Sequence, residues 1–148
     1  MPRLLIVGYG NRLRSDDGVG FRAAELLRER CVNCAVEILA VPQLTPELVE
    51  PVSRARHVVF IDAAAEGPPG EIRRRTLAAP SSGAVFTHQM TPEALLAGAA
   101  ALYGASPSAV LYSISGESFA YGEHLTPAVE RALTELVATI QHAAVGAD

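Results

Sequence analysis

The chain of 148 residues has 49% hydrophobic and 19% charged side chains, a balance typical of a globular protein with a single core. We therefore expect one domain over residues 1–148. The formal net charge of −4 argues against a nucleic-acid partner, because such proteins are usually basic. No apolar run approaches the roughly 20 residues of a membrane span, and the apolar stretch at the N-terminus is too short for a secretory signal. We expect a cytoplasmic protein that does not bind a membrane.

The first segment combines a buried strand with a glycine-rich turn. Residues 3–8 form an apolar run that predicts a strand, and residues 17–30 carry apolar side chains at helical spacing. Asp16 and Asp17 stand where this helix begins. Open α/β sheets build their sites at the carboxyl edge of the strands, so the turn is typical of a site rather than of a simple connector.

The rest of the chain alternates strands and helices without repeats. Further strands are predicted over residues 35–41, 57–62, 70–77 and 108–114. Three helix starts are indicated by the pairs Thr45-Pro46, Thr91-Pro92 and Thr126-Pro127, the last opening a helix over 126–142. Threonine can cap free amide groups, and proline fits the first helical position because it has no N–H. The glutamates after the first two pairs favour the positive end of the helix dipole.

The strand over residues 70–77 follows its predecessor too closely for a crossover helix, so we expect it to run antiparallel. Its arginine triplet at 73–75 suits a sheet edge, and a basic docking patch is the functional alternative. Together the elements predict an α/β fold. The expected architecture is a three-layer αβα sandwich whose five-stranded, mostly parallel sheet has one antiparallel edge strand.

Cys31 and Cys34 form a lone C-x-x-C pair. They follow the first predicted helix, whose C-terminal dipole disfavours a thiolate, whereas reactive pairs stand at helix N-termini. A structural zinc site needs four ligands, and the sequence holds no second pair. We expect two ordinary reduced thiols.

Three polar side chains converge in the predicted fold. Asp17 (or Asp16) follows the first strand, Asp62 ends the third, and His88 lies in the loop before the helix that starts at Thr91. Two carboxylates and one imidazole suit a divalent metal such as zinc, nickel or iron, and they also suit acid–base catalysis without a metal. In the plainer interpretation, the aspartates complement a helix dipole or a turn and His88 is solvated. Without a G-x-S-x-G motif or a cysteine at a strand-to-helix turn, no protein nucleophile is evident.

Four blocks of the sequence resemble the maturation endopeptidases of nickel-iron hydrogenases, which process the C-terminus of the large subunit. The blocks are Gly8-Tyr9-Gly10-Asn11 with Asp16-Asp17-Gly18-Val19-Gly20, then Phe60-Ile61-Asp62-Ala63, His88-Gln89 and Leu125-Thr126-Pro127. Their order and spacing agree over nearly the whole chain. The resemblance implies the αβα fold predicted above. It also implies a peptidase that removes a short C-terminal extension from the large subunit after nickel insertion.

The resemblance also implies roles for single residues. By position, Asp17, Asp62 and His88 are the nickel-contacting residues, and they serve as both the catalytic and the metal residues. The nickel is carried by the substrate, so no tightly bound metal of the protein's own is expected. Asp16 is a neighbour that tunes the site or caps the helix. The implied partner is the large-subunit precursor, and this protein is expected to act on it as a monomer.

The sequence departs from the family pattern at three places. An Asp-Gly-Gly-Thr-like segment is replaced by residues 40–45, His124 stands where a glycine is usual, and the loop at 116–121 lacks a common proline. These changes affect which large subunit is the substrate. Two alternatives stay open: a nickel-binding chaperone without catalysis, and a nucleotide-binding domain. The latter lacks the third glycine of G-x-G-x-x-G, because Leu13 stands there.

Overall fold

The computed structural model describes residues 3–31, 35–80 and 90–145. Five strands are present, β1 (Leu4–Tyr9), β2 (Val36–Val41), β3 (His57–Ala64), β4 (Ile72–Leu77) and β5 (Ser108–Ser115). The α-helices are α1 (Val19–Arg30), α2 (Val49–Arg54), α3 (Pro92–Tyr103) and α4 (Pro127–Val145). Short 3-10 turns, η1 (Ser15–Gly18) and η2 (Pro46–Leu48), lead into α1 and α2.

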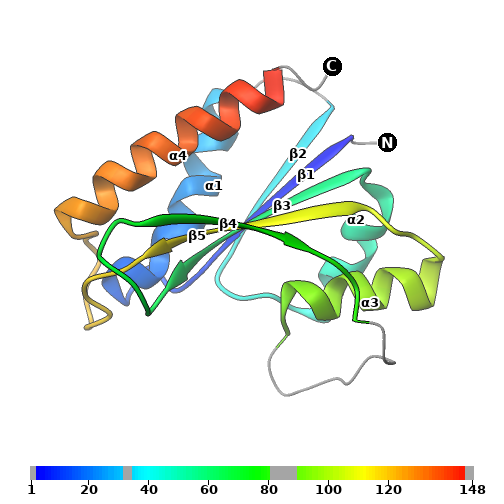
Figure 1. Ribbon diagram of the computed structural model, residues 1–148, viewed down its shortest axis with the longest axis horizontal. Coiled ribbons are helices and arrows are strands. Elements are labelled where there is room, and N and C mark those ends of the chain that lie inside the picture. Colours follow the sequence, from blue (N-terminus) through cyan, green and yellow to red (C-terminus); the bar gives the residue numbers. More distant parts are fainter. Residues whose placement is uncertain (1–2, 32–34, 81–89, 146–148) are drawn as a thin grey trace.

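The five strands form one sheet in the order β2-β1-β3-β5-β4. All neighbours are parallel except β4, which pairs antiparallel with β5 at the edge. Helices α1 and α4 cover one face of the sheet, and α2 and α3 cover the other (Figure 1). The predicted three-layer sandwich with one antiparallel edge strand is therefore confirmed.

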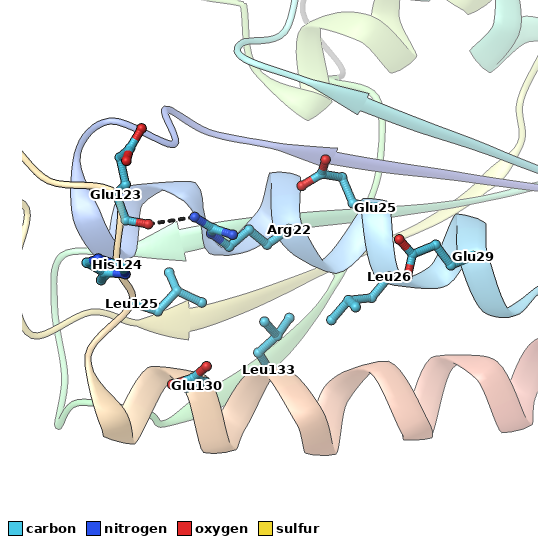
Figure 2. A pocket seen from close by; sticks show the side chains of 9 residues that line it. All are labelled: Arg22, Glu25, Leu26, Glu29, Glu123, His124, Leu125, Glu130 and Leu133. Carbon is cyan, nitrogen blue, oxygen red and sulfur yellow. Dashed lines mark hydrogen bonds between the residues drawn. The ribbon is translucent and has the colours of Figure 1, made fainter.

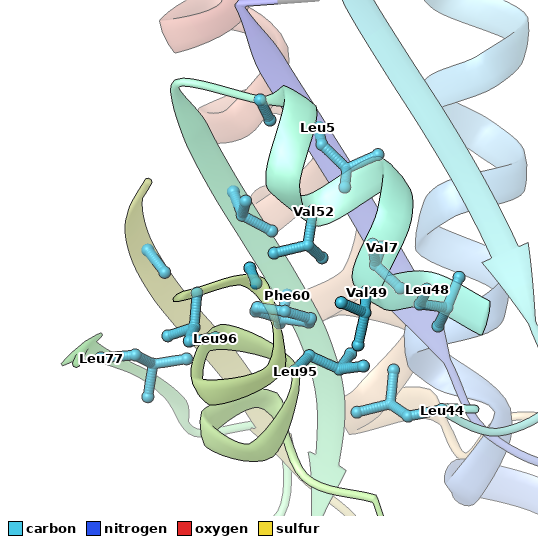
Figure 3. Close-up of a cluster of buried hydrophobic side chains, with 14 residues drawn as sticks. Leu5, Val7, Leu44, Leu48, Val49, Val52, Phe60, Leu77, Leu95 and Leu96 are labelled. Atoms are coloured by element: carbon cyan, nitrogen blue, oxygen red, sulfur yellow. The ribbon is translucent and has the colours of Figure 1, made fainter. Parts of the chain in front are cut away.

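Two cores lie on the two faces of the sheet, because successive strand side chains point in opposite directions. Leu5, Val7 and Phe60 belong to the core under α2 and α3, shown in Figure 3, whereas Ile6 and Ile61 belong to the core under α1 and α4. All five side chains are fully buried. A shift of one residue in the pairing of β1 with β3 would exchange the two sets, so the packing fixes the register that positions the site.

Two glycines bring α1 unusually close to the sheet. A Cβ added to Gly8 would lie 2.0 Å from the carbonyl oxygen of Gly20, and one added to Gly20 would lie 2.2 Å from that of Ile61. Neither position can hold a side chain without moving the backbone. This close approach places the start of α1, and the η1 turn before it, against the carboxyl ends of β1 and β3.

The structure confirms the expected position of the arginine triplet on an edge strand and one of the expected threonine caps. The arginine side chains at 73–75 are exposed on the edge strand β4. The hydroxyl of Thr91 accepts a hydrogen bond from the N–H of Ala94 at 3.1 Å, the expected cap, whereas Thr45 makes no such bond. No helix in the described ranges is both long and apolar enough to cross a membrane.

Candidate active site

Two carboxylates lie at the carboxyl edge of the central strands. β1 and β3 are paired neighbours up to Gly8 and Ile61, and Asp62 follows on β3. Asp17 lies in the η1 turn that continues from β1. The Asp17 carboxylate accepts a hydrogen bond from the N–H of Asn11 at 2.9 Å, and that of Asp62 accepts one from its neighbour Ala63 at 2.7 Å. The predicted neighbourhood of the first and third strands is confirmed.

Asp62 is held toward its neutral form. Burial raises the pKa of its carboxyl, the negative charge of Asp17 raises it further, and hydrogen bonds from Tyr9 and Ala63 oppose both, so that the pKa is about 6. For Tyr9, burial, the charge of Asp62 and the hydrogen bond to it all raise the phenol pKa above its ordinary value. Tyr9 therefore stays protonated and donates to Asp62. Asp17 and Asp62 are close enough to influence each other electrostatically.

Asp16 has a different environment, although it adjoins Asp17 in the sequence. Its side chain is fully buried and accepts hydrogen bonds from the backbone N–H groups of Glu117, Ser118 and Thr126, at 2.8, 3.1 and 2.8 Å. The Thr126 hydroxyl donates a fourth at 2.7 Å. Burial alone would raise the pKa of Asp16, but these donors outweigh it and lower the pKa below the ordinary value.

Asp16 was expected either to tune the site or to cap the helix, and the hydrogen bonds of its carboxylate to the described residues go to neither η1 nor α1. Neither η1 nor α1 has a side-chain hydrogen bond at its N-cap. The partners of Asp16 lie instead in the segment before α4, so its carboxylate fastens residues 117–126 to the site edge. Of the two adjacent aspartates, Asp17 is the one whose charge acts on Asp62.

His88, the third predicted site residue, lies outside the described residues. Within the described ranges, no group of three or more His, Cys, Asp or Glu side chains could hold a metal ion. The three-residue site of Asp17, Asp62 and His88 therefore stays a prediction.

Three residues around Asp62 were not predicted as part of the site: Tyr9, Arg75 and Glu93. Tyr9, which hydrogen-bonds Asp62, directly precedes Gly10 in the first motif block, and that position was the available signal. Glu93, expected only to favour a helix dipole, pairs with Arg75 of β4 at 3.2 Å. After burial and Asp62, the charge of Glu93 also raises the pKa of Tyr9, and Arg75 lowers it. The ion pair therefore borders the site from α3 and β4.

The glycine turn after β1 packs against the protein itself. Gly10 has a φ of +148°, and a Cβ there would lie 2.0 Å from the carbonyl oxygen of Asp17. The turn needs glycine because the η1 backbone approaches it. This contact removes the main reason for the nucleotide-binding alternative, in which the glycines would make room for a phosphate.

Cys31 shows no sign of reactivity. Its half-buried thiol follows the last turn of α1, and burial raises the thiol pKa. A raised pKa reduces the thiolate fraction on which reactivity depends. Cys34 lies outside the described residues, so the prediction of ordinary thiols is tested only at Cys31.

The fold and the paired carboxylates together define a class: an αβα protein with two neighbouring carboxylates at the carboxyl edge of a parallel sheet, where such folds place their sites. No family profile matches the chain. The hydrogenase expression/formation protein HupD of Thiocapsa roseopersicina is 37% identical over 75 residues, which cover 49% of this chain and 34% of that protein. The aligned stretch thus spans about a third of the length of this curated relative.

Solved structures resemble nearly the whole chain. The [NiFe] hydrogenase maturation protease HycI of Thermococcus kodakarensis KOD1 is 25% identical with a TM-score of 0.80, covering 95% of this chain and 90% of that one. The hydrogenase maturating endopeptidase HybD of E. coli is 28% identical with a TM-score of 0.69, covering 95% and 93%. In sequence and in fold, the chain is therefore similar to [NiFe] hydrogenase maturation proteases.

Proposed function

We propose that this protein is an endopeptidase that removes the C-terminal extension of a nickel-iron hydrogenase large-subunit precursor after nickel insertion, and that it recognises the nickel held by that substrate. The observation that carries the proposal is the meeting of Asp17 and Asp62 at the carboxyl edge of β1 and β3. The family of the structural relatives supports the kind of reaction and partner.

The electrostatics of the carboxylate pair favour a cation from outside. Burial and the nearby charge of Asp17 disfavour the ionised form of Asp62, and a divalent cation placed between the two groups would relieve both penalties. With His88 as third ligand, the set leaves coordination positions open for donors from the substrate. Affinity for a free ion should be modest, because the substrate's own thiolates supply the rest of the shell.

The same arrangement can support peptide hydrolysis. A substrate nickel would polarise the scissile carbonyl or lower the pKa of a bound water. Water adds to the carbonyl carbon, the C–N bond breaks, and a proton passes to the leaving amine. The oxygen of Asp62 that does not contact the nickel can take up the proton of the attacking water.

The test is to incubate the protein with nickel-loaded and nickel-free precursor and to measure the mass of the large subunit. We expect loss of the extension only from the loaded precursor, and well under one metal per chain in the isolated protein. Cleavage of the empty precursor, or stoichiometric zinc in the isolated protein, would indicate an ordinary metallopeptidase instead. Binding of loaded precursor without cleavage would identify a non-catalytic chaperone.

A further inference from the structure

A hollow of about 830 Å³ opens beside the carboxylate site. It is bounded by the loop after β1, the end of β2, the first turns of α1 and the segment before α4. Asn11 belongs to its lining and also donates its N–H to the Asp17 carboxylate at 2.9 Å. A peptide whose scissile bond reaches Asp17 can therefore extend into this hollow.

The lining of the hollow contains two guanidinium groups. Arg12 and Arg22 belong to it, together with the imidazole of His124 and the carboxylate of Glu123. The Arg12 guanidinium lies over the ring of Phe21, with 4.5 Å between its central carbon and the ring centroid. None of the ion pairs among the described residues involves Arg12. Stacking holds the plane of the guanidinium and leaves its edge N–H donors for a ligand, the geometry that suits a carboxylate.

The neighbouring hollow between α1 and α4 has the opposite character. Figure 2 shows Arg22 reaching from α1 to the carbonyl oxygen of Glu123, a hydrogen bond of 2.5 Å that ties the segment before α4 to this helix. Beyond that tie, the lining includes the carboxylates of Glu25, Glu29 and Glu130. An anionic group is therefore disfavoured on the α1–α4 side and favoured beside Arg12.

We propose that the hollow beside Arg12 binds a carboxylate of the substrate peptide, and that Arg12 is the specificity-determining residue that pairs with it. The inference rests on the proposed function, since it assigns the hollow to the extension of the same substrate. The carboxylate can come from an acidic side chain in the extension or from its free C-terminus. Both sources present the same planar group to the guanidinium.

The kinetic test compares two arginines of one loop. Arg12→Gln should raise KM for loaded precursor about 10-fold with kcat nearly unchanged, because a charge-assisted hydrogen bond to bound substrate is lost. Arg14→Gln is the matched control, since its guanidinium lies over Tyr121 at 5.4 Å and Arg14 is not part of the lining. A wild-type KM for Arg12→Gln, or an equal rise for Arg14→Gln, overturns the proposal.

Altered precursors separate the two sources of the carboxylate. In one, the acidic residues of the extension are changed to amides; in the other, neutral residues lengthen the extension and move its C-terminus away. We expect one of these changes to raise KM for the wild-type protein about 10-fold and to have no further effect in Arg12→Gln. Independent, additive effects of the arginine and both substrate changes would contradict the pairing.

A binding test without cleavage distinguishes failure of this inference from failure of the proposed function. Acetyl-Ala-Glu-Ala-amide and acetyl-Ala-Ala-Ala with a free carboxylate are titrated into the protein, with acetyl-Ala-Gln-Ala-amide as the neutral control. An acidic peptide should shift the NMR amide signals of Asn11 and Leu13, and the shift should vanish in Arg12→Gln. If the precursor is not cleaved at all, the proposed function fails and this titration alone decides the carboxylate site. Equal shifts from the neutral peptide, or no shift from either acid, overturn it.

Discussion

Asp16 and Asp62 lie at the same edge of the sheet but in opposite electrostatic environments. Asp16 is fully buried and receives four hydrogen bonds, so its pKa is lowered despite burial. Asp62 is partly buried, has fewer donors and lies near the charge of Asp17. Its pKa is raised to about 6, chiefly by burial.

Burial raises the pKa of both carboxylates, and the comparison shows that the number of hydrogen-bond donors decides whether the pKa ends above or below its ordinary value. The Asp16 carboxylate accepts hydrogen bonds from three backbone N–H groups and from the Thr126 hydroxyl, and so keeps a loop in place. The ionised form of Asp62 is destabilised by burial and by the charge of Asp17, and binding a cation or a proton would relieve this. Asp17, the neighbour of Asp16 in the same short turn, accepts a hydrogen bond from the N–H of Asn11 and, among the described residues, does not bind the segment that Asp16 holds.

The largest expected effect is on processing. Asp62→Asn and Asp17→Asn should each slow cleavage of loaded precursor at least about 100-fold, because several kcal/mol of metal-based stabilisation are lost. We expect the same of His88→Ala from the sequence prediction. The measurement is the mass of the large subunit over time, with circular dichroism to check the fold. Full activity of Asp62→Asn would remove the site assignment.

Asp16→Asn should act on stability rather than directly on chemistry. The amide can place its oxygen where one carboxylate oxygen was, but its NH₂ then faces a backbone N–H, at a cost of about 2–4 kcal/mol. Urea unfolding measures the loss, and Asp17→Asn is the control because it should change stability by less than about 1 kcal/mol. If Asp16→Asn stays folded and shows the same processing defect as Asp17→Asn, then Asp16 does not have the purely structural role assigned to it.

The two carboxylates should also give stability opposite dependences on pH. The folded state raises the pKa of Asp62 to about 6, so the stability linked to its proton is fully present below its ordinary pKa and is lost as pH rises through about 6. For Asp16, whose pKa is lowered, stability is present above the ordinary pKa and is lost as pH falls through the lowered one.

Unfolding experiments between pH 4 and pH 7 test this opposition. The free energy of unfolding of Asp62→Asn, relative to that of the wild type, should rise by about 2–3 kcal/mol between pH 4 and pH 7. The reason is that the wild type must ionise a buried carboxyl over this range, whereas the amide does not titrate. The free energy of unfolding of Asp16→Asn should fall below that of the wild type most at neutral pH and less in acid. A difference between Asp62→Asn and wild type that does not vary with pH would show that Asp62 titrates normally.

The smallest expected effect concerns Tyr9. Its hydrogen bond lowers the pKa of Asp62, so Tyr9→Phe should raise that pKa further and move the acid limb of the pH–rate profile to higher pH by less than about one unit. Tyr103→Phe is the control, because Tyr103 is exposed at the end of α3. An unchanged profile in Tyr9→Phe would mean that Asp62 is tuned by burial and Asp17 alone.

The sequence by itself determined the order of the elements and the edge of the sheet that carries the site. Strand and helix periods, Thr-Pro starts and the short link to the β4 strand are local signals, and the structure bears out the architecture that they predict. The positions of Asp17 and Asp62 after neighbouring strands followed from the same signals.

Only the tertiary structure decided how these residues are used. Asp16 meets donors 101 to 110 residues away in the chain, so no local pattern could separate its role from that of Asp17. The hydroxyl of Thr126, just before α4, donates a hydrogen bond to this distant carboxylate. The hydrogen bond of Tyr9 to Asp62 and the stacking of Arg12 on Phe21 arise where separate elements meet. Charge and solvent exposure depend on such distant neighbours, whereas helix and strand formation depends mainly on near ones.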